Sequence, residues 1–385
     1  MALKKRTIQW AVRLLLLAGA LFMVLGGPLP RIARKVLPIL SPLTAFSEAV
    51  AQRTWFAALY WVLPPLAILL LAVFKGRFFC QWLCPLGTLY SLPQKISVKK
   101  TVLPVRLNAL IFWAIIGGSL FGLPALLFLD PLSTFSRLGV WHDAAMWIPG
   151  AIIPLFFLLS IFQPQLWCTH LCPLGYSFDL ANRKTGKSVF KRDRRQFLAG
   201  LGIGGAAAAI FPNIRKSKNN PSILPPGATP KFSETCTRCY ACAAVCPTQI
   251  IKVKKGGALL ELAMPELCFD DGACEEFCTR CTQVCPTGAI RELTVDKKRH
   301  TKIGEAEIDR KACLAWEDNE YCMVCDEFCP YSAIATHTQR NGIACPKMIP
   351  KLCRGCGACE ENCPAIRAGK AILVSTITPQ EKLSS

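Results

Sequence analysis

The chain has 385 residues, with 45 Lys and Arg against 25 Asp and Glu, and it contains 22 cysteines. This length allows two or more domains. The formal charge of +20 is unevenly spread, because residues 1–212 hold 22 basic and 5 acidic side chains and residues 213–385 hold 23 and 20. No basic stripe with interleaved stacking aromatics is present, so we expect no nucleic-acid partner.

Four apolar stretches in the first half approach the ~20 residues that a membrane-spanning helix needs. They are residues 8–25, 54–74, 109–129 and 146–162. Arg13 interrupts the first stretch, and Trp and Phe near the ends of the stretches are typical of a membrane interface. We therefore predict a membrane α-helical bundle of four helices over residues 1–190, in preference to the buried helices of a large soluble protein.

Basic residues flank these stretches unevenly. They cluster at residues 4–6, 75–106 and 183–195, and the positive-inside rule places such segments in the cytoplasm. Four further basic residues within 31–53 fit this topology less well. We expect the chain to lie in a bacterial inner membrane, with whatever follows the fourth helix and its basic flank exported to the periplasmic side.

Residues 191–212 read KRDRRQFLAGLGIGGAAAAIFP. The twin arginine at 194–195, followed by a short Gly/Ala-rich apolar run, resembles a twin-arginine export signal. The alternative is an ordinary basic flank before a fifth helix, which predicts the same topology. We expect this segment to remain attached as a fifth anchor helix. The proline-containing residues 213–235 would then form an extended linker.

Sixteen cysteines after this linker form four groups, each of which ends in Cys-Pro. The groups are Cys236, Cys239, Cys242 and Cys246; Cys274, Cys278, Cys281 and Cys285; Cys313, Cys322, Cys325 and Cys329; and Cys353, Cys356, Cys359 and Cys363. In bacterial ferredoxins such spacing lets three close cysteines hold one [4Fe-4S] cluster while the fourth ligates its neighbour. We predict an α+β ferredoxin-like domain over residues 236–385 with four [4Fe-4S] clusters, in place of zinc or disulfides.

The remaining features of this half are few. Cys268 and Cys345 fall outside the four groups, and we interpret them as structural cysteines, although either could substitute in a cluster. Only His300 and His337 occur after the linker, which disfavours mixed Cys/His zinc sites. No nucleophile–base pair, Walker loop or dinucleotide-binding glycine pattern is present. The four predicted clusters therefore indicate electron transfer.

Two shorter motifs lie in the apolar half, 78-FFCQWLCPLG-87 and 166-LWCTHLCPLG-175. Cysteines spaced i, i+4 project from one face of a helix. The pairs Cys80/Cys84 and Cys168/Cys172 could therefore meet in a four-thiolate site that binds a fifth iron–sulfur cluster. The basic flanks place this site on the cytoplasmic face, opposite the exported clusters. The alternatives are a redox-active dithiol pair and packing cysteines.

These motifs resemble those of a known family. The cysteine-rich half resembles the NapG and MauM ferredoxin-type proteins, which place four tetracysteine groups behind a twin-arginine signal. The first half resembles NapH and MauN through 76-GRFFCQWLCPL-86 and 167-WCTHLCP-173. The chain looks like a fusion of the two types without the cytoplasmic two-cluster ferredoxin domain of NapH. The sequence leaves open which fourth cysteine crosses to which cluster; in related multi-cluster ferredoxins the first and last groups share one pair of clusters, and the middle two share the other.

The resemblance implies a quinol dehydrogenase, or its electron-transfer subunit. Quinol oxidation needs a proton acceptor, and ionisable residues at helix ends are the default candidates. These are Asp130, Arg137 and His142, which follow the third stretch, and His170, which is also an alternative ligand. Loop solvation or helix capping would explain each of them equally well. An outward quinol site would also leave the cytoplasmic cysteine pairs on the far side of the membrane.

The expected partners are membrane lipid, the quinone pool, and a periplasmic cytochrome c or reductase. Other subunits of a membrane redox complex could replace the last of these. Two alternative functions fit the same features. One is a metal-reduction or assembly polyferredoxin, similar to those that reduce copper. The other is an electron-transfer subunit without its own quinol site.

Overall fold

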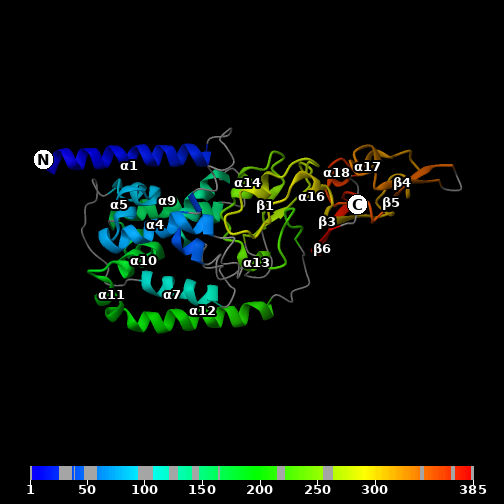
Figure 1. Ribbon diagram of the computed structural model, residues 1–385. Helices are drawn as coiled ribbons and strands as arrows, with labels where there is room; N and C mark the ends of the chain where they lie inside the picture. Colours follow the sequence, from blue (N-terminus) through cyan, green and yellow to red (C-terminus); the bar gives the residue numbers. More distant parts are fainter. Residues whose placement is uncertain are drawn as a thin grey trace.

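The computed structural model describes residues 2–25, 37–38, 40–46, 59–93, 107–120, 129–140, 147–163, 165–214, 222–254, 263–338, 342–365 and 369–382. Two parts follow one another along the chain (Figure 1). Residues 2–214 form the helical half, and residues 222–382 form the cysteine-rich half, which carries all the strands that the structure describes. The first half is packed around an apolar core that includes Leu86, Ile115 and Phe178, and the second around Phe232, Phe269 and Ile290.

The helical half contains long apolar helices joined by short helical segments. Its elements are α1 (Ala2–Leu25), α4 (Leu59–Lys75), α5 (Phe78–Trp82), α6 (Pro85–Leu89), α7 (Asn108–Leu120), α8 (Pro131–Ser136), η3 (Arg137–Val140), α9 (Trp147–Phe162), η5 (Trp167–Leu171), α10 (Pro173–Ala181), α11 (Gly186–Arg192) and α12 (Arg194–Ile214). A further helical turn covers residues 42–46. Each of the four predicted apolar stretches therefore overlaps one of the helices α1, α4, α7 and α9.

The helices differ from the predicted stretches in length. The third stretch was expected to run to residue 129, but α7 ends at Leu120 and residues 121–128 lie outside the described part. Within the described ranges, one segment, Thr7–Val24 of α1, is long and apolar enough to cross a membrane. Shorter apolar helices cover Leu63–Lys75, Asn108–Leu120 and Ala151–Phe162.

The predicted fifth helix forms and packs along α7 (Figure 1). Glycines allow the close approach of the two helices. A Cβ at Gly204 would lie 2.4 Å from the carbonyl oxygen of Ala114, and one at Gly200 would lie 2.7 Å from the Cβ of Trp113. The glycine-rich sequence of this segment therefore serves helix packing, whatever its role in export.

The cysteine-rich half alternates short helices with antiparallel strand pairs. Its helices are α13 (Phe232–Thr235), α14 (Ala241–Ala244), α15 (Arg280–Gln283), α16 (Val295–Arg299), α17 (Val324–Glu327) and α18 (Ala358–Glu361). Its strands are β1 (Ile251–Val253), β2 (Pro265–Leu267), β3 (Thr301–Ile308), β4 (Ile334–Thr338), β5 (Ala344–Met348) and β6 (Ile372–Lys382). The pairs are β1–β2, β3–β6 and β4–β5. This α+β arrangement agrees with the predicted ferredoxin-like class.

The strand pairs connect the cysteine motifs in a regular way. β1 and β2 lie between the first and second motifs, with Ile251 opposite Leu267. β4 and β5 lie between the third and fourth motifs. β3 follows the second motif and β6 follows the fourth, and Ile308 lies opposite Ile372 where they pair. The first two motifs with β1–β2 between them, and the last two with β4–β5 between them, therefore form two similar modules. The β3–β6 pair joins these modules.

The predicted linker is in part a packed segment. Residues 215–221 lie outside the described part. Beyond them, the carbonyl of Ser222 accepts a hydrogen bond from Thr376 Oγ1 at 3.1 Å, and the carbonyl of Pro225 accepts one from Gln380 Nε2 at 2.9 Å. α13 then leads into the first cysteine motif. Residues 222–235 therefore belong to the cysteine-rich half and do not extend freely between the halves.

Candidate iron–sulfur sites

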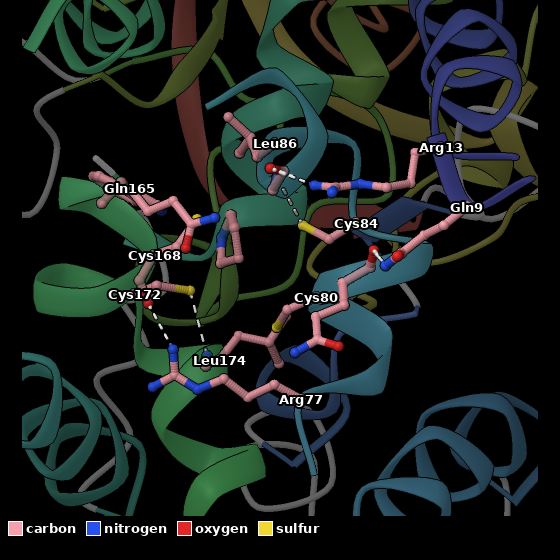
Figure 2. Close-up of a pocket in the computed structure, with 15 residues that line it drawn as sticks. Gln9, Arg13, Arg77, Cys80, Cys84, Leu86, Gln165, Cys168, Cys172 and Leu174 are labelled. Carbon is pink, nitrogen blue, oxygen red and sulfur yellow. Dashed lines mark hydrogen bonds between the residues drawn. The ribbon is translucent and has the colours of Figure 1, made fainter. Parts of the chain in front are cut away.

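The four cysteines of the two Cys-x-x-x-Cys-Pro motifs face one cavity in the helical half (Figure 2). Cys80 lies in α5 and Cys84 directly before α6, while Cys168 lies in η5 and Cys172 directly before α10. The cavity has a volume of about 250 Å³. The structure thus brings the two pairs together, as the motif repeat predicts, and metal binding by these cysteines stays a prediction.

The second cysteine of each motif caps a helix. Cys84 has φ −69° and ψ 117°, and its Sγ accepts a hydrogen bond from Gly87 N at 3.4 Å. Cys172 makes the same bond with Gly175 N at 3.4 Å. A proline follows each cysteine, and the residue before a proline avoids the α region. The expectation that each pair lies on one continuous helix is therefore wrong, because the helix ends between the two thiols.

The glycine of each Cys-Pro-Leu-Gly sequence lies against the carbonyl of the first cysteine. A Cβ at Gly87 would lie 2.7 Å from the oxygen of Cys80, which backbone atoms would have to move to accommodate. A Cβ at Gly175 would lie 3.3 Å from the oxygen of Cys168. Capping and close packing thus explain the shared sequence, and together they direct two sulfurs from each motif to the cavity.

Two arginines also line the cavity. Arg77 donates from Nε and Nη2 to the carboxylate of Asp179 at 2.7 and 2.5 Å, and from Nη1 to the carbonyl of Cys168 at 3.2 Å. Arg13 of α1 donates to Ser91 Oγ at 2.7 Å. Both cations oppose the negative charge that thiolates place in the cavity. Neither was predicted as a site residue, although Arg13 lies inside an apolar stretch, where a charged side chain is a functional signal.

A second internal repeat forms part of the cavity wall. Residues 41-SPLTAF-46 and 130-DPLSTF-135 each lead into a helical turn. Ser41 Oγ donates to Asp130 Oδ1 at 2.6 Å, and Asp130 Oδ2 accepts from Ser133 N at 3.0 Å. Pro131 lines the cavity. Asp130 is fully buried as a helix cap, so its role in the fold is structural before any role in proton transfer.

The remaining quinol candidates are also held by structural contacts. Arg137 Nε donates to the carbonyl of Arg238 at 3.1 Å. His170 is buried, and its Nε2 lies 3.4 Å from Gln163 Nε2. His142 lies outside the described residues. None of the three candidates that the structure describes is among the residues lining the cavity, so these three do not come together around it.

The sixteen cysteines of the other half form four sets, which together are called the ladder. Each set combines three cysteines of one motif with the last cysteine of another. The four side chains of a set lie close enough for their charges to interact. The first set is Cys236, Cys239, Cys242 and Cys285; the second is Cys274, Cys278, Cys281 and Cys246; the third is Cys313, Cys322, Cys325 and Cys363; the fourth is Cys353, Cys356, Cys359 and Cys329. The second and third sets each line a small cavity of their own.

The exchange of cysteines thus runs between the first and second motifs, and between the third and fourth. This exchange differs from that of related multi-cluster ferredoxins, in which the first and last motifs share a pair of clusters; the sequence alone left the exchange open. The physical reason is the connection between motifs. The β1–β2 hairpin returns the chain to the first motif, and the β4–β5 hairpin returns it to the third.

Contacts between the sets give the ladder an order. Cys274 N donates to the carbonyl of Cys356 at 2.8 Å, so the second and fourth sets adjoin. The first set adjoins the helical half, where Ser136 Oγ donates to the carbonyl of Cys239 at 3.1 Å. The order from the helical half is therefore first, second, fourth and third, and α17 of the third motif lies far from that half (Figure 1).

The four-cysteine cavity and the ladder are close to each other. Pro131 at the start of α8 lines the cavity, and Ser136 at its end contacts the first set. A six-residue helix spans about 9 Å, whereas the hydrocarbon core of a bilayer is about 30 Å thick. The cavity and the ladder therefore lie closer together than a placement on opposite faces of a membrane predicts.

The ladder sets fit thiolate-bound iron–sulfur clusters. Burial raises the pKa of Cys236 to about 12 and that of Cys239 to about 11, so a metal must displace the thiol proton on binding. Backbone N–H groups point at the sulfurs, with Arg238 N 3.4 Å from Cys236 Sγ and Ala333 N 3.3 Å from Cys329 Sγ. Such hydrogen bonds are typical of cluster sites. Among the described residues, no three His, Cys, Asp or Glu are close enough to hold a single metal ion.

The two additional cysteines lie outside all four sets. Cys268 Sγ donates to Asp270 Oδ2 at 2.9 Å near the surface. Cys345 is fully buried in β5, and its Sγ donates to the carbonyl of Ala315 at 3.1 Å. Both positions agree with the interpretation of these residues as structural cysteines.

Together, these features define a ferredoxin-type electron-transfer protein with several 4Fe-4S sites. Family models agree with this class. A 4Fe-4S binding domain matches residues 57–104 and 144–195, a 4Fe-4S dicluster domain matches residues 235–289, and another 4Fe-4S binding domain matches residues 353–367. The first match includes both Cys-x-x-x-Cys-Pro motifs, and the dicluster match covers the first two motifs that exchange cysteines.

The chain belongs to the family of ferredoxin-type proteins that includes NapF, NapG, NapH and MauM. It is 34% identical to NapF of Escherichia coli K12 over 39% of this chain and 84% of that protein. It is 25% identical to the methylamine utilization protein MauM of Methylobacillus flagellatus over 49% and 87% of the two chains. The corresponding values for NapH of Haemophilus influenzae are 22%, 64% and 87%. No solved structure matches the chain.

Proposed function

We propose that the protein oxidises quinol in the bacterial inner membrane and passes the electrons through its ladder to a periplasmic cytochrome or reductase. The observation that carries this proposal is continuity. The cavity with four cysteines, the short helix α8, and the four ladder sets follow one another by direct contact. This continuity supports electron transfer from the helical half into the ladder.

The surface of the helical half supports a membrane location. Large apolar side chains on α1, α4, α9 and α12 are strongly exposed. Leu15, Phe22, Phe74, Phe162 and Leu198 are each between 62% and 73% exposed. Exposed apolar surface over several neighbouring helices marks a contact with lipid or with a partner protein. With the basic flanks, it favours lipid and a ladder on the periplasmic side.

The residues around the cavity have distinct proposed roles. Its four cysteines would hold a fifth iron–sulfur cluster, and the four ladder sets would each hold one [4Fe-4S] cluster. When bound, these clusters accept and release single electrons, so the two electrons of a quinol leave one after the other while its two protons go to water. Arg13 and Arg77 stabilise negative charge at the cavity. Gln9, Gln81 and Gln165 line it with amides that can bind a quinol hydroxyl.

Reduction of the purified full-length chain by a quinol analogue tests this proposal. The protein would be reconstituted in lipid without oxygen, and the bleaching of the iron–sulfur absorption and the electron paramagnetic resonance spectrum would be followed. We expect quinol to reduce the ladder, with a total of about eighteen to twenty irons per chain if the cavity holds a cluster and about sixteen if it does not. Reduction by dithionite but never by quinol would contradict the quinol reaction and leave electron transfer intact.

A further inference from the structure

Two side chains of the helical half bind the backbone of the first cysteine motif. Ser136 Oγ donates to the carbonyl of Cys239 at 3.1 Å, and Arg137 Nε donates to the carbonyl of Arg238 at 3.1 Å. All four residues are buried, and Arg137 is only 1% exposed. A guanidinium group is therefore held out of water beside a cysteine of the first set.

The loop that they bind has a strained backbone. Arg238 and Tyr240 have φ values of 54° and 56°, in the left-handed region that costs a non-glycine residue roughly 1 kcal/mol or more. In the fourth motif the matching positions are Gly355 and Gly357, with φ values of 72° and 82°. The same loop conformation thus occurs twice, and the first motif builds it from residues that disfavour it.

The two loops are also supported differently. In the fourth motif, β3 lies directly behind the loop, since a Cβ at Gly355 would come within 2.4 Å of Gly304 N. In the first motif, the loop leads into α14, which packs against η3 of the helical half. The carbonyls of Arg238 and Cys239 in this strained loop therefore accept hydrogen bonds from Arg137 and Ser136, which lie about one hundred residues earlier in the chain.

We propose that Ser136 and Arg137 are positioning residues that raise the reduction potential of the cluster in the first set. Reduction adds a negative charge to a cluster, and a nearby buried cation stabilises that charge. The two hydrogen bonds fix the peptide dipoles next to Cys239 and hold its sulfur in place. The effect makes the first set a better electron acceptor for a donor in the helical half. The inference rests on cluster binding by the first set, and it is independent of the quinol reaction.

Two substitutions of Arg137 in the full-length, cluster-loaded protein separate charge from packing. Arg137→Gln removes the charge and keeps an amide donor, whereas Arg137→Lys keeps the charge and loses the planar guanidinium. Midpoint potentials would be measured by dithionite titration with paramagnetic resonance detection, and iron and labile sulfide would be counted. We expect Arg137→Gln to move the potential of one cluster to a more negative value and leave the others unchanged. Arg137→Lys should show a smaller shift.

The controls keep the proposal falsifiable. Arg192→Gln removes a cation that is 52% exposed on α11, and it should leave every potential unchanged. If Arg137→Gln lowers the iron content by about four and the signal of one cluster alone disappears, Arg137 is needed to retain the cluster, and the proposed effect on its potential is then decided by Ser136→Ala. If Arg137→Gln keeps all its iron and every potential is unchanged, the proposal is wrong. Should Arg137→Gln fail to fold, Ser136→Ala decides by the same criterion, because it deletes only one of the two hydrogen bonds.

Discussion

The four-cysteine cavity and the ladder assemble their cysteines in different ways. The cavity receives two cysteines from each of two copies of one motif, which are separated by more than eighty residues in the sequence. Each ladder set receives three cysteines from one motif and one from a neighbouring motif. The cavity therefore exists only when the whole helical half is packed, whereas most of a ladder set is determined by local sequence.

The two regions also hold their sulfurs by different devices. In the cavity a proline ends one helix, a cysteine caps the next, and a glycine allows close packing. In the ladder, loops with left-handed residues direct backbone N–H groups toward the sulfurs. This comparison predicts that substitutions in the cavity will act on the helical half as a unit, and that substitutions in the ladder will act on single sets.

The largest expected effect comes from removing one cysteine of each cavity pair. In the double variant Cys84→Ser and Cys172→Ser we expect reduction of the ladder by quinol to fall to background, because the cavity loses two of its four thiols. Dithionite should still reduce the ladder, whose iron content should remain about sixteen per chain. Cys268→Ser, outside every set, is the matched control. An unchanged rate of reduction by quinol in the double variant would contradict a redox role for the cavity.

Removing a crossing cysteine should disrupt a single ladder set. Cys285→Ala deletes the fourth ligand of the first set, and its paramagnetic resonance spectrum should lose the same signal as that of Cys239→Ala. Cys246→Ala should instead abolish the signal of the second set. Each variant should lose about four irons. If Cys363→Ala abolished the signal that Cys239→Ala removes, the first motif would exchange with the last, and the crossing seen in the structure would be wrong.

The two cavity glycines provide a graded test of packing. Gly87→Ala should destabilise the helical half by about 1–3 kcal/mol, as overpacking commonly does, because its Cβ would lie 2.7 Å from a backbone oxygen. Gly175→Ala should cost less, because its Cβ would lie 3.3 Å from the equivalent oxygen. Thermal unfolding in detergent measures both. Equal effects would show that the two motifs relax alike despite their different spacing.

Much of the ladder was predictable from the sequence, because its motifs are local. Three of the four cysteines in each set come from one motif, and in every set except the third, where eight residues separate Cys313 from Cys322, they follow one another closely. The fourth cysteine depends on how the strands return the chain, and the strands are only three residues long in the β1–β2 pair and five in the β4–β5 pair. The sequence therefore left the exchange open, and the arrangement of related ferredoxins does not carry over to this chain, because its hairpins connect the motifs differently.

The cavity was predictable only in outline. The repeated motif indicates that Cys80/Cys84 and Cys168/Cys172 meet, but the i, i+4 spacing suggests one continuous helix for each pair, whereas the proline after the second cysteine keeps that cysteine out of the α region. The shorter repeat between residues 41–46 and 130–135 was available in the sequence and would have suggested that Asp130 belongs to a structural pair. The position of α8 between the cavity and the first set could not have been predicted. Basic flanks indicate on which side of a membrane a loop lies, but not how a short helix packs against the rest of the protein.

The smallest effect is expected at the ion pair that borders the cavity. Arg77 bonds Asp179 through two nitrogens, and the two side chains are 26% and 28% exposed. Arg77→Lys removes the two-pronged geometry, and we expect a loss of about 1 kcal/mol, at the upper end for exposed pairs. Arg192→Lys alters the ion pair between Arg192 and its neighbour Asp193, in which the arginine side chain is 52% exposed. It should change the free energy of unfolding by less than about 0.5 kcal/mol.

Thermal unfolding measures the stability of Arg77→Lys and Arg192→Lys. The rate at which quinol reduces the ladder in each variant is a second measurement. Arg77 also holds the carbonyl of Cys168 at 3.2 Å, so Arg77→Lys should slow ladder reduction by quinol more than it lowers stability. Arg192 has no such contact with a cavity cysteine among the bonds that the structure describes, and its variant should keep the full rate. If both variants kept the full rate, Arg77 would stabilise the fold around the cavity without influencing electron transfer from quinol. The predicted role of Arg77 in that transfer would then be wrong.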